Sequence, residues 1–143
     1  MCSDLTSPSV FGILTDMRKE DILALLGRLL LAIIFLASAF GKITNFEATM
    51  RFMDAHGMPM AMLFCVAAIV LEALGAIALI LGYMTRWGAV SLFGFLVAAT
   101  WIFHSAADQR IQLLKNLAIM GGLLQVAAFG PGELSLDGRD RSK

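Results

Sequence analysis

The chain has 143 residues, of which 59% are hydrophobic and 15% are charged, and its formal net charge is zero. A soluble domain usually carries about 25% charged residues. The charges here cluster at the two ends and in short connectors, which is the pattern of a chain embedded in lipid. The neutral balance and the lack of a basic run exclude nucleic acid as a partner.

The first 21 residues are too polar to contain the apolar region of a signal peptide. We expect residues 1–21 to form an N-terminal cytoplasmic tail. A short interfacial helix within Leu5–Met17 remains an alternative, because this stretch contains several apolar residues.

Four apolar stretches follow, at about 22–40, 60–83, 87–103 and 113–129. Each has the roughly 20 residues that cross a bilayer's hydrocarbon core. Backbone polar groups in hydrocarbon must be paired within their own segment, so each stretch predicts a helix. The expected fold is therefore all-α: an antiparallel, up-down, four-helix transmembrane bundle over residues 22–132. Residues 133–143 are expected to form a C-terminal cytoplasmic tail.

Two connectors carry structural information of their own. The longer one, Gly41 to Pro59, has Phe46, Met50 and Met53 at helical spacing, with charged residues between them. This pattern predicts a short amphipathic helix on the membrane face. The other connector, Met84 to Arg86, is so short that the second and third spans must be antiparallel neighbours.

The distribution of lysine and arginine predicts the orientation in the membrane, because cytoplasmic loops carry an excess of these residues. Six lie on the side of the two termini and four on the opposite side, so we expect a bacterial inner-membrane protein with both termini in the cytoplasm. The six are Arg18, Lys19, Arg86, Arg139, Arg141 and Lys143, and the four are Lys42, Arg51, Arg110 and Lys115.

Charged residues inside a span are costly and usually face the bundle interior with a partner. At 1.5 Å per residue, Arg28 lies about 9 Å and Glu72 about 15 Å from the cytoplasmic ends of their spans. We therefore expect Arg28, Glu72 and Gln125 to form one buried polar cluster. Two interpretations stay open: a pocket for a head group such as a quinone, with Glu72 protonatable, or a structural ion pair that fixes helix packing.

A second polar group is expected at the opposite membrane face. His104 in this group could titrate near neutral pH or donate to a quinone carbonyl, and the alternative is that these residues cap helix ends and contact lipid head groups. The group comprises Lys42, Asn45, His56, His104, Asp108, Lys115 and Asn116.

No spacing of Cys or His residues predicts a metal site, and no phosphate-binding loop or nucleophile–base pair is present. Apart from a quinone, no cofactor is evident. Any redox chemistry would therefore take its electrons from a bound quinone or a redox partner protein.

These features together resemble the DoxX family of small bacterial membrane proteins. The matching segments are GRLLLAIIFLASAFGKITNF (27–46), HGMP (56–59), LEALGAIALILGYMTRWGA (71–89), the end of the third span at His104, and KNLAIMGGLLQVAAFGPGELSLD (115–137). The resemblance implies a four-helix transmembrane bundle with cytoplasmic termini. The family takes its name from subunits of a thiosulfate:quinone oxidoreductase, although most members have no established reaction.

Three functions remain from these observations. The first is a membrane subunit of a quinone-linked redox or stress-response system, in which Arg28 and Glu72 shape a polar pocket. The second is a non-catalytic scaffold that anchors or assembles a partner enzyme. The third, a small-solute carrier, is the least favoured, because the four short spans show neither the inverted repeat nor the broken helix typical of transporters. Besides the lipid bilayer, the sequence leaves a homo-oligomer open as a further association.

Overall fold

The computed structural model describes residues 19–103 and 110–141, and this part of the chain is almost entirely helical, without strands. The expectation for residues 1–18 lies outside the described residues. The helices are α2 (Lys19–Thr44), α3 (Phe46–Ala55), α4 (Ala61–Leu81), α5 (Thr85–Phe103), α6 (Arg110–Phe129) and α7 (Leu136–Arg141).

Four of these helices, α2, α4, α5 and α6, are long and apolar enough to cross a membrane, with mean hydropathies between 1.4 and 2.6. The predicted all-α, four-span fold is thus confirmed. The boundaries agree within two residues except that α6 begins three residues earlier, at Arg110, and that α2 begins at Lys19 and continues to Thr44. This extension brings Lys42 into the helix, where the sequence had suggested a loop.

The four long helices form two antiparallel pairs, α2 with α4 and α5 with α6, and α4 also packs against α5. Their shared core contains Phe35, Leu79, Leu92 and Leu123, all nearly inaccessible. Gly75 allows the close approach of α4 and α5, since a Cβ atom there would lie 2.5 Å from Leu92 Cγ. Small residues permit such contacts in membrane helices, where packing rather than water exclusion drives association.

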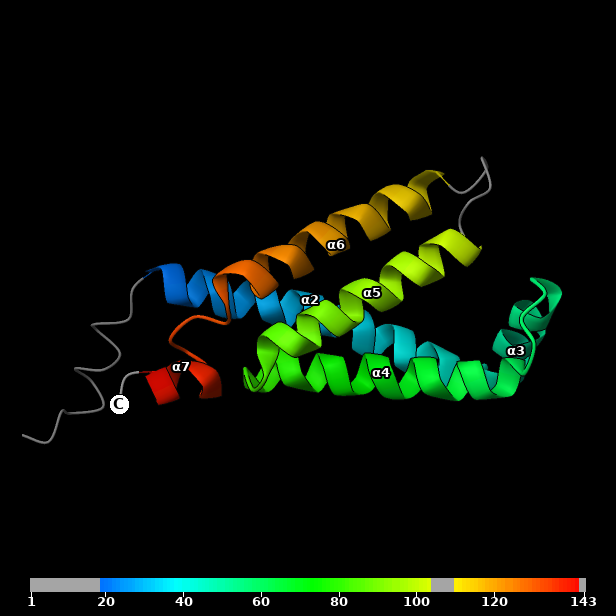
Figure 1. Ribbon diagram of the computed structural model, residues 1–143, viewed down its shortest axis with the longest axis horizontal. Coiled ribbons are helices and arrows are strands. Elements are labelled where there is room, and N and C mark those ends of the chain that lie inside the picture. The colour runs from blue at the N-terminus through cyan, green and yellow to red at the C-terminus, as the bar shows by residue number, and fades with distance from the viewer. Residues whose placement is uncertain (1–18, 104–109, 142–143) are drawn as a thin grey trace, which may run out of the picture.

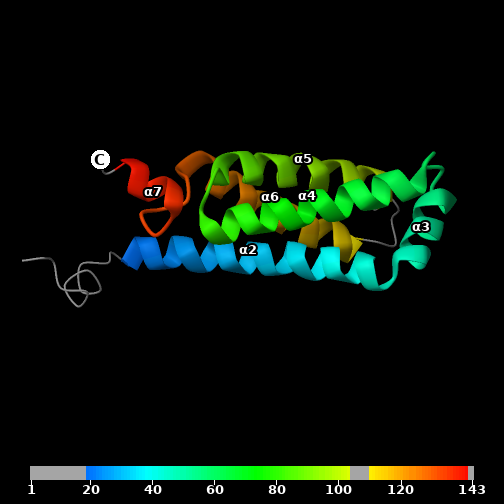
Figure 2. The same cartoon turned by 90° about the horizontal axis from the view of Figure 1, so that it is seen from below.

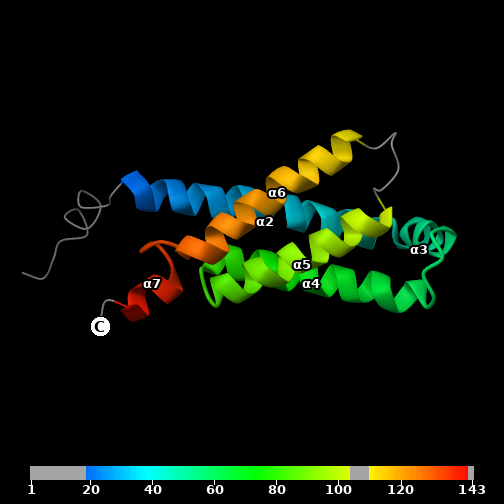
Figure 3. The ribbon, with the colours of Figure 1, turned by 45° about the horizontal axis from the view of Figure 1, so that its top comes forward.

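The two ends of the bundle differ. The start of α2, the α4–α5 turn and α7 lie together at one end, and α3 lies at the other (Figure 1). Toward the α3 end, α5 and α6 lean away from α2 and α4 in Figure 1, and Figure 3 shows their separation from α4. Figure 2 shows α3 standing across that end of the molecule. We call the end of the bundle with α7 the closed end and the end with α3 the open end.

The connecting elements follow their local sequence. In α3, Met53 is buried while Glu47, Arg51 and Asp54 are exposed, so the predicted amphipathic helix is confirmed. The α4–α5 turn begins at Gly82, whose φ of +66° is the left-handed conformation with which glycine commonly ends a helix.

The predicted C-terminal tail begins with a segment that packs on the bundle. After α6 ends, residues 130–138 return along the start of α2 and reach the α4–α5 turn (Figure 2). The Asp137 carboxylate accepts hydrogen bonds from the backbone N–H groups of Met84 and Thr85, both 2.9 Å, and from the Thr85 hydroxyl, 3.1 Å. It thereby satisfies backbone donors at the start of α5, as a capping residue does, but from 52 residues away.

A polar-lined cavity as the candidate functional site

Glu72, near the middle of α4, pairs with Lys42 near the end of α2. Lys42 Nζ lies 2.9 Å from both carboxylate oxygens of Glu72 and donates a third hydrogen bond, of 2.6 Å, to Ser38 Oγ. Ser38 in turn donates to Glu72 Oε1 at 3.1 Å. The Glu72 side chain is 3% exposed and that of Lys42 is 19% exposed. We call this network the Lys42–Ser38–Glu72 triad; every Lys42 proton has an acceptor in it.

The antiparallel register of α2 and α4 explains why Glu72 pairs with Lys42 and not with Arg28. Ser38 bonds to Glu72, whereas Arg28, ten residues before Ser38 in α2, lies against Gly82, ten residues after Glu72 at the end of α4. Ten helical residues correspond to about 15 Å along the axis. The predicted pairing of Arg28 with Glu72 is therefore wrong.

Arg28 belongs to the closed end. Its Nη2 donates to the Leu134 carbonyl at 2.6 Å, and the Asp137 carboxylate attracts the guanidinium electrostatically. The residue is only 1% exposed, and its Nε and Nη1 atoms have no hydrogen-bond partner among the described residues. Nearby, Asp21 accepts the backbone N–H of Glu133 at 3.1 Å. These charges bind the chain's own backbone at the closed end.

Gln125, the third member of the predicted cluster, is exposed on α6. The structure thus separates all three residues, with Arg28 at the closed end, Gln125 on the surface and Glu72 in the triad. The sequence analysis measured the depth of each residue from the cytoplasmic end of its own span and assumed that all spans end at the same level. They do not, because α2 extends well beyond α4 at the closed end.

A cavity of about 600 Å³ lies at the open end, bounded by residues of α2, α3, α4, α5 and α6. Most of its wall is apolar. Its polar lining comprises Ser38, Lys42, Thr49, Glu72, Gln112, Lys115 and Asn116. The triad therefore lies in the wall of a mainly apolar chamber, an arrangement typical of sites for small lipophilic ligands.

The wall that α6 contributes is one face of that helix. Gln112, Lys115, Asn116 and Ile119 line the cavity, at the i, i+3, i+4 and i+7 spacing of a single helical face. Asn116 is buried, and its Nδ2 donates to Thr100 Oγ1 on α5 at 2.9 Å. Its side-chain amide is thus held by α5, while Lys115 has no ion-pair or hydrogen-bond partner within the described part of the chain.

The polar group predicted for this membrane face is only partly brought together. Lys42, Lys115 and Asn116 line the cavity with Glu72, which the sequence had assigned to a different cluster. His56 is exposed and forms an aromatic cluster with Phe52 and Phe103, with ring centroids 4.3 and 5.3 Å from its own. His104 and Asp108 lie outside the described residues.

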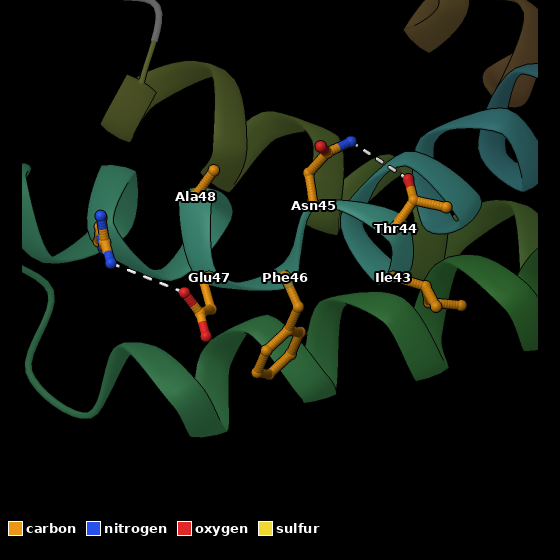
Figure 4. Close-up of a pocket in the computed structure, with 7 residues that line it drawn as sticks. Ile43, Thr44, Asn45, Phe46, Glu47 and Ala48 are labelled. Carbon is orange, nitrogen blue, oxygen red and sulfur yellow. Dashed lines mark hydrogen bonds and ion pairs between the residues drawn. The ribbon is translucent and has the colours of Figure 1, made fainter.

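Asn45 lies at a second hollow, of about 680 Å³, at the junction of α2 and α3. Figure 4 shows Asn45 turned toward Thr44, to which its Nδ2 donates at 3.1 Å, while the Phe46 ring points the opposite way. The Glu47–Arg51 ion pair at its edge, 3.6 Å long, is more than 80% exposed on both sides. This surface hollow has no buried charge or converging polar groups, so we regard the cavity at the open end as the functional site.

Neither cysteine chemistry nor a metal centre emerges from the described residues. Cys65 is a free, fully buried thiol on α4, and no three His, Cys, Asp or Glu side chains in residues 19–103 and 110–138 gather as metal ligands would.

Sequence reasoning missed Ser38, Thr49, Thr100 and Gln112 as members or supports of the site. A signal was available for two of them. Ser38 precedes Lys42 by four residues and Gln112 precedes Lys115 by three, spacings that place each pair on one helical face. Thr100 carries no comparable signal, because its role depends on the hydrogen bond from Asn116 on another helix, and the sequence places no recognised site residue beside Thr49.

Fold and site together define a multi-pass membrane protein with a mainly apolar, charge-lined cavity between its helices. The chain belongs to the DoxX family, whose family model matches residues 23–105. No solved structure matches the chain.

Two similar proteins come from Escherichia coli K12. Inner membrane protein YqjF is 39% identical over 123 residues, covering 84% of this chain and 93% of that protein, and inner membrane protein YphA is 34% identical over 128 residues, covering 84% and 91%. The ER-derived vesicles protein ERV29 of Saccharomyces cerevisiae is 24% identical over 148 residues, covering 94% of this chain and 41% of that protein. With its four apolar helices, the chain is accordingly a multi-pass inner-membrane protein.

Proposed function

We propose that this protein is a membrane subunit of a quinone-linked redox or stress-response system and that the cavity at the open end binds the quinone. The observation that carries this proposal is a buried ion pair, Lys42–Glu72, in the wall of a mainly apolar cavity of about 600 Å³. Ligand pockets typically have volumes of about 300–1,000 Å³, apolar walls and a few polar groups that orient the ligand.

The cavity residues fit the two parts of a quinone. Apolar and aromatic side chains such as Phe35, Phe64 and Phe95 would hold the ring and its chain, and the polar groups would orient the carbonyl oxygens. A bound quinone supplies two-electron chemistry coupled to protons. Glu72, the carboxylate among the described residues that line the cavity, would exchange a proton in that chemistry.

The electrons would come from a partner protein, because the sequence contains no dinucleotide or metal signature of its own. We further propose that both termini are cytoplasmic, from the excess of lysine and arginine on their side. The cavity would then lie in the outer half of the membrane.

Filling the cavity tests the proposal. Ala99→Phe adds a ring to the cavity wall, whereas Gly121→Phe adds the same ring on α6 where an added Cβ meets no atom within 4 Å. Titration of ubiquinone-1 into the protein in lipid nanodiscs should give saturable binding that Ala99→Phe weakens at least tenfold and Gly121→Phe retains. Equal binding by both variants, or by empty nanodiscs, would overturn the assignment of the cavity.

The role of Glu72 is tested by Glu72→Gln, which keeps the shape but cannot carry a negative charge or exchange a proton. We expect a folded protein that binds ubiquinone-1 but fails to complement a deletion strain. Full complementation by Glu72→Gln would exclude a role for Glu72 in proton transfer. Complementation by the cavity-filled Ala99→Phe protein would instead favour the scaffold function, in which the bundle only anchors a partner.

Orientation is tested in a variant lacking Cys2 and Cys65. An impermeant thiol reagent applied to intact cells should label Asp54→Cys, on the exposed face of α3, but not Lys143→Cys. Labelling of Lys143→Cys alone would reverse the proposed topology.

A further inference from the structure

We propose that Lys115 is the residue that recognises the ligand's head group, and that it makes the cavity selective for lipophiles with an anionic oxygen head, such as a carboxylate. This inference rests on the cavity of the proposed function but not on the quinone itself. It assigns a ligand chemistry and a specificity residue to the same chamber.

The first argument is that Lys42 has no donor left for a ligand. Its ammonium group carries three protons, and these are directed at Ser38 Oγ and the two oxygens of Glu72, at 2.6 to 2.9 Å. A ligand that recruited Lys42 would have to break a bond to a carboxylate that is 3% exposed. Such a loss leaves a buried charge unpaired and is strongly unfavourable.

The second argument is that Lys115 is uncommitted. Its exposed side chain lines the cavity from α6, and it has no ion-pair or hydrogen-bond partner among residues 19–103 and 110–138. Its neighbours on the same helical face, Gln112 and Asn116, add polar groups beside it. An ammonium group with free donors binds an anionic oxygen more strongly than a neutral one.

The third argument is the charge of the lining. Two cations, Lys42 and Lys115, and one anion, Glu72, line the cavity, so its net charge is positive by one. Lys115 is exposed, so that excess is partly screened by its surroundings, and a single negative head group bound in the cavity would neutralise the remainder. The apolar remainder of the chamber suits the hydrocarbon part of the same molecule.

An alternative explanation for Lys115 is that its long side chain extends to the lipid head groups from a position near the helix end, as lysines often do. The two explanations differ in one observable. A lysine that only reaches the membrane surface has no effect on which ligand the cavity holds, whereas a recognition residue determines it.

The experiment compares two ligands of equal chain length, dodecanoate and dodecan-1-ol, titrated at pH 8 into the full-length protein in zwitterionic nanodiscs. The wild type should bind dodecanoate at least about tenfold more tightly, the ratio expected when a charge-assisted hydrogen bond replaces a neutral one. Lys115→Met should lose this preference, and Lys115→Arg should keep it. Arg110→Met removes the same charge from the same helix outside the cavity lining and should also keep it.

Equal affinities for the two ligands in the wild type, or a preserved preference in Lys115→Met, would overturn the inference. Competition with ubiquinone-1 separates it from the proposed function. If ubiquinone-1 displaces dodecanoate, the site serves both; if ubiquinone-1 does not bind while the dodecanoate preference depends on Lys115, the quinone proposal fails and this inference stands. If ubiquinone-1 binds saturably and the wild type shows no preference for dodecanoate, the quinone proposal stands and this inference fails.

Discussion

The two ends of the bundle contain similar charged residues and use them in different ways. At the closed end, Arg28, Asp21 and Asp137 bind backbone groups of segments far away in the sequence. At the open end, Lys42 and Glu72 bind each other and line a cavity. A charged residue in a membrane helix therefore does not by itself indicate a binding site. It indicates a structural role where its partner is the chain's own backbone, and a candidate site where its partner is a side chain that lines a cavity.

The difference has energetic consequences. A charge bonded to backbone groups holds together segments that would otherwise separate, so its removal should affect stability and leave the cavity unchanged. A charge in the cavity wall contributes to stability through its partner and to binding through its position. Substitutions at the two ends can therefore be told apart by measuring unfolding and ligand binding on the same variants.

The largest effect is expected for Glu72→Ala. It leaves the Lys42 ammonium without its carboxylate, and truncating one partner of a buried pair costs about 3 to 5 kcal/mol. Partial exposure of Lys42 favours the lower part of this range. Glu47→Ala, which breaks an exposed pair in α3, should cost less than about 1 kcal/mol. Unfolding in mixed micelles by increasing SDS gives both values, and similar losses would contradict the assignment of a buried pair.

The partner of Glu72 can be identified by a double-mutant cycle. Lys42→Leu with Glu72→Leu should be less destabilising than the sum of the single changes, with a coupling energy of about 1 to 3 kcal/mol. Arg28→Leu with Glu72→Leu should be additive, because the two side chains lie about 15 Å apart along the bundle. Coupling in the second pair and not in the first would contradict the helix register described here.

A smaller loss is expected for Asp137→Ala at the closed end. This change removes the acceptor of three hydrogen bonds at the start of α5, each contributing about 1 kcal/mol. The control, Asp54→Ala, removes an exposed carboxylate from α3 and should change the unfolding free energy by about 0.5 kcal/mol or less. Ubiquinone-1 binding per folded molecule should be unchanged in Asp137→Ala. A loss of binding would mean that the two ends are coupled.

The smallest effects are expected at two glycines. Gly82→Ala forces a Cβ into the left-handed conformation, which costs about 1 to 2 kcal/mol, and directs it at Arg28 Nη1 and Ser135. Gly41→Ala, inside α2 at the open end, meets no atom within 4 Å and should stabilise the helix by about 0.5 to 1 kcal/mol. Thermal unfolding of both variants should move in opposite directions. A stabilising Gly82→Ala would refute the tight contact at the closed end.

The sequence by itself determined the elements. Hydropathy and length predicted the four spans, because a bilayer requires about 20 apolar residues in a helix. Amphipathic spacing predicted α3, and the short Met84–Arg86 connector required α4 and α5 to be antiparallel neighbours. Lys42, Glu72, Lys115 and Asn116 were also recognised as polar residues of interest. These features are local, so a few neighbouring residues suffice to specify them.

Only the tertiary structure decided which of these residues meet. Hydropathy could not define the ends of α2, which is three residues longer at its start and four residues longer at its end than expected. The register of α2 against α4 therefore differs from the expected one, and Glu72 pairs with Lys42 instead of Arg28. The partner of Arg28 is a backbone carbonyl, which every residue possesses and which no sequence pattern therefore reveals. The cavity depends on α5 and α6 leaning away from α2 and α4, a property of packing between helices that are distant in the sequence.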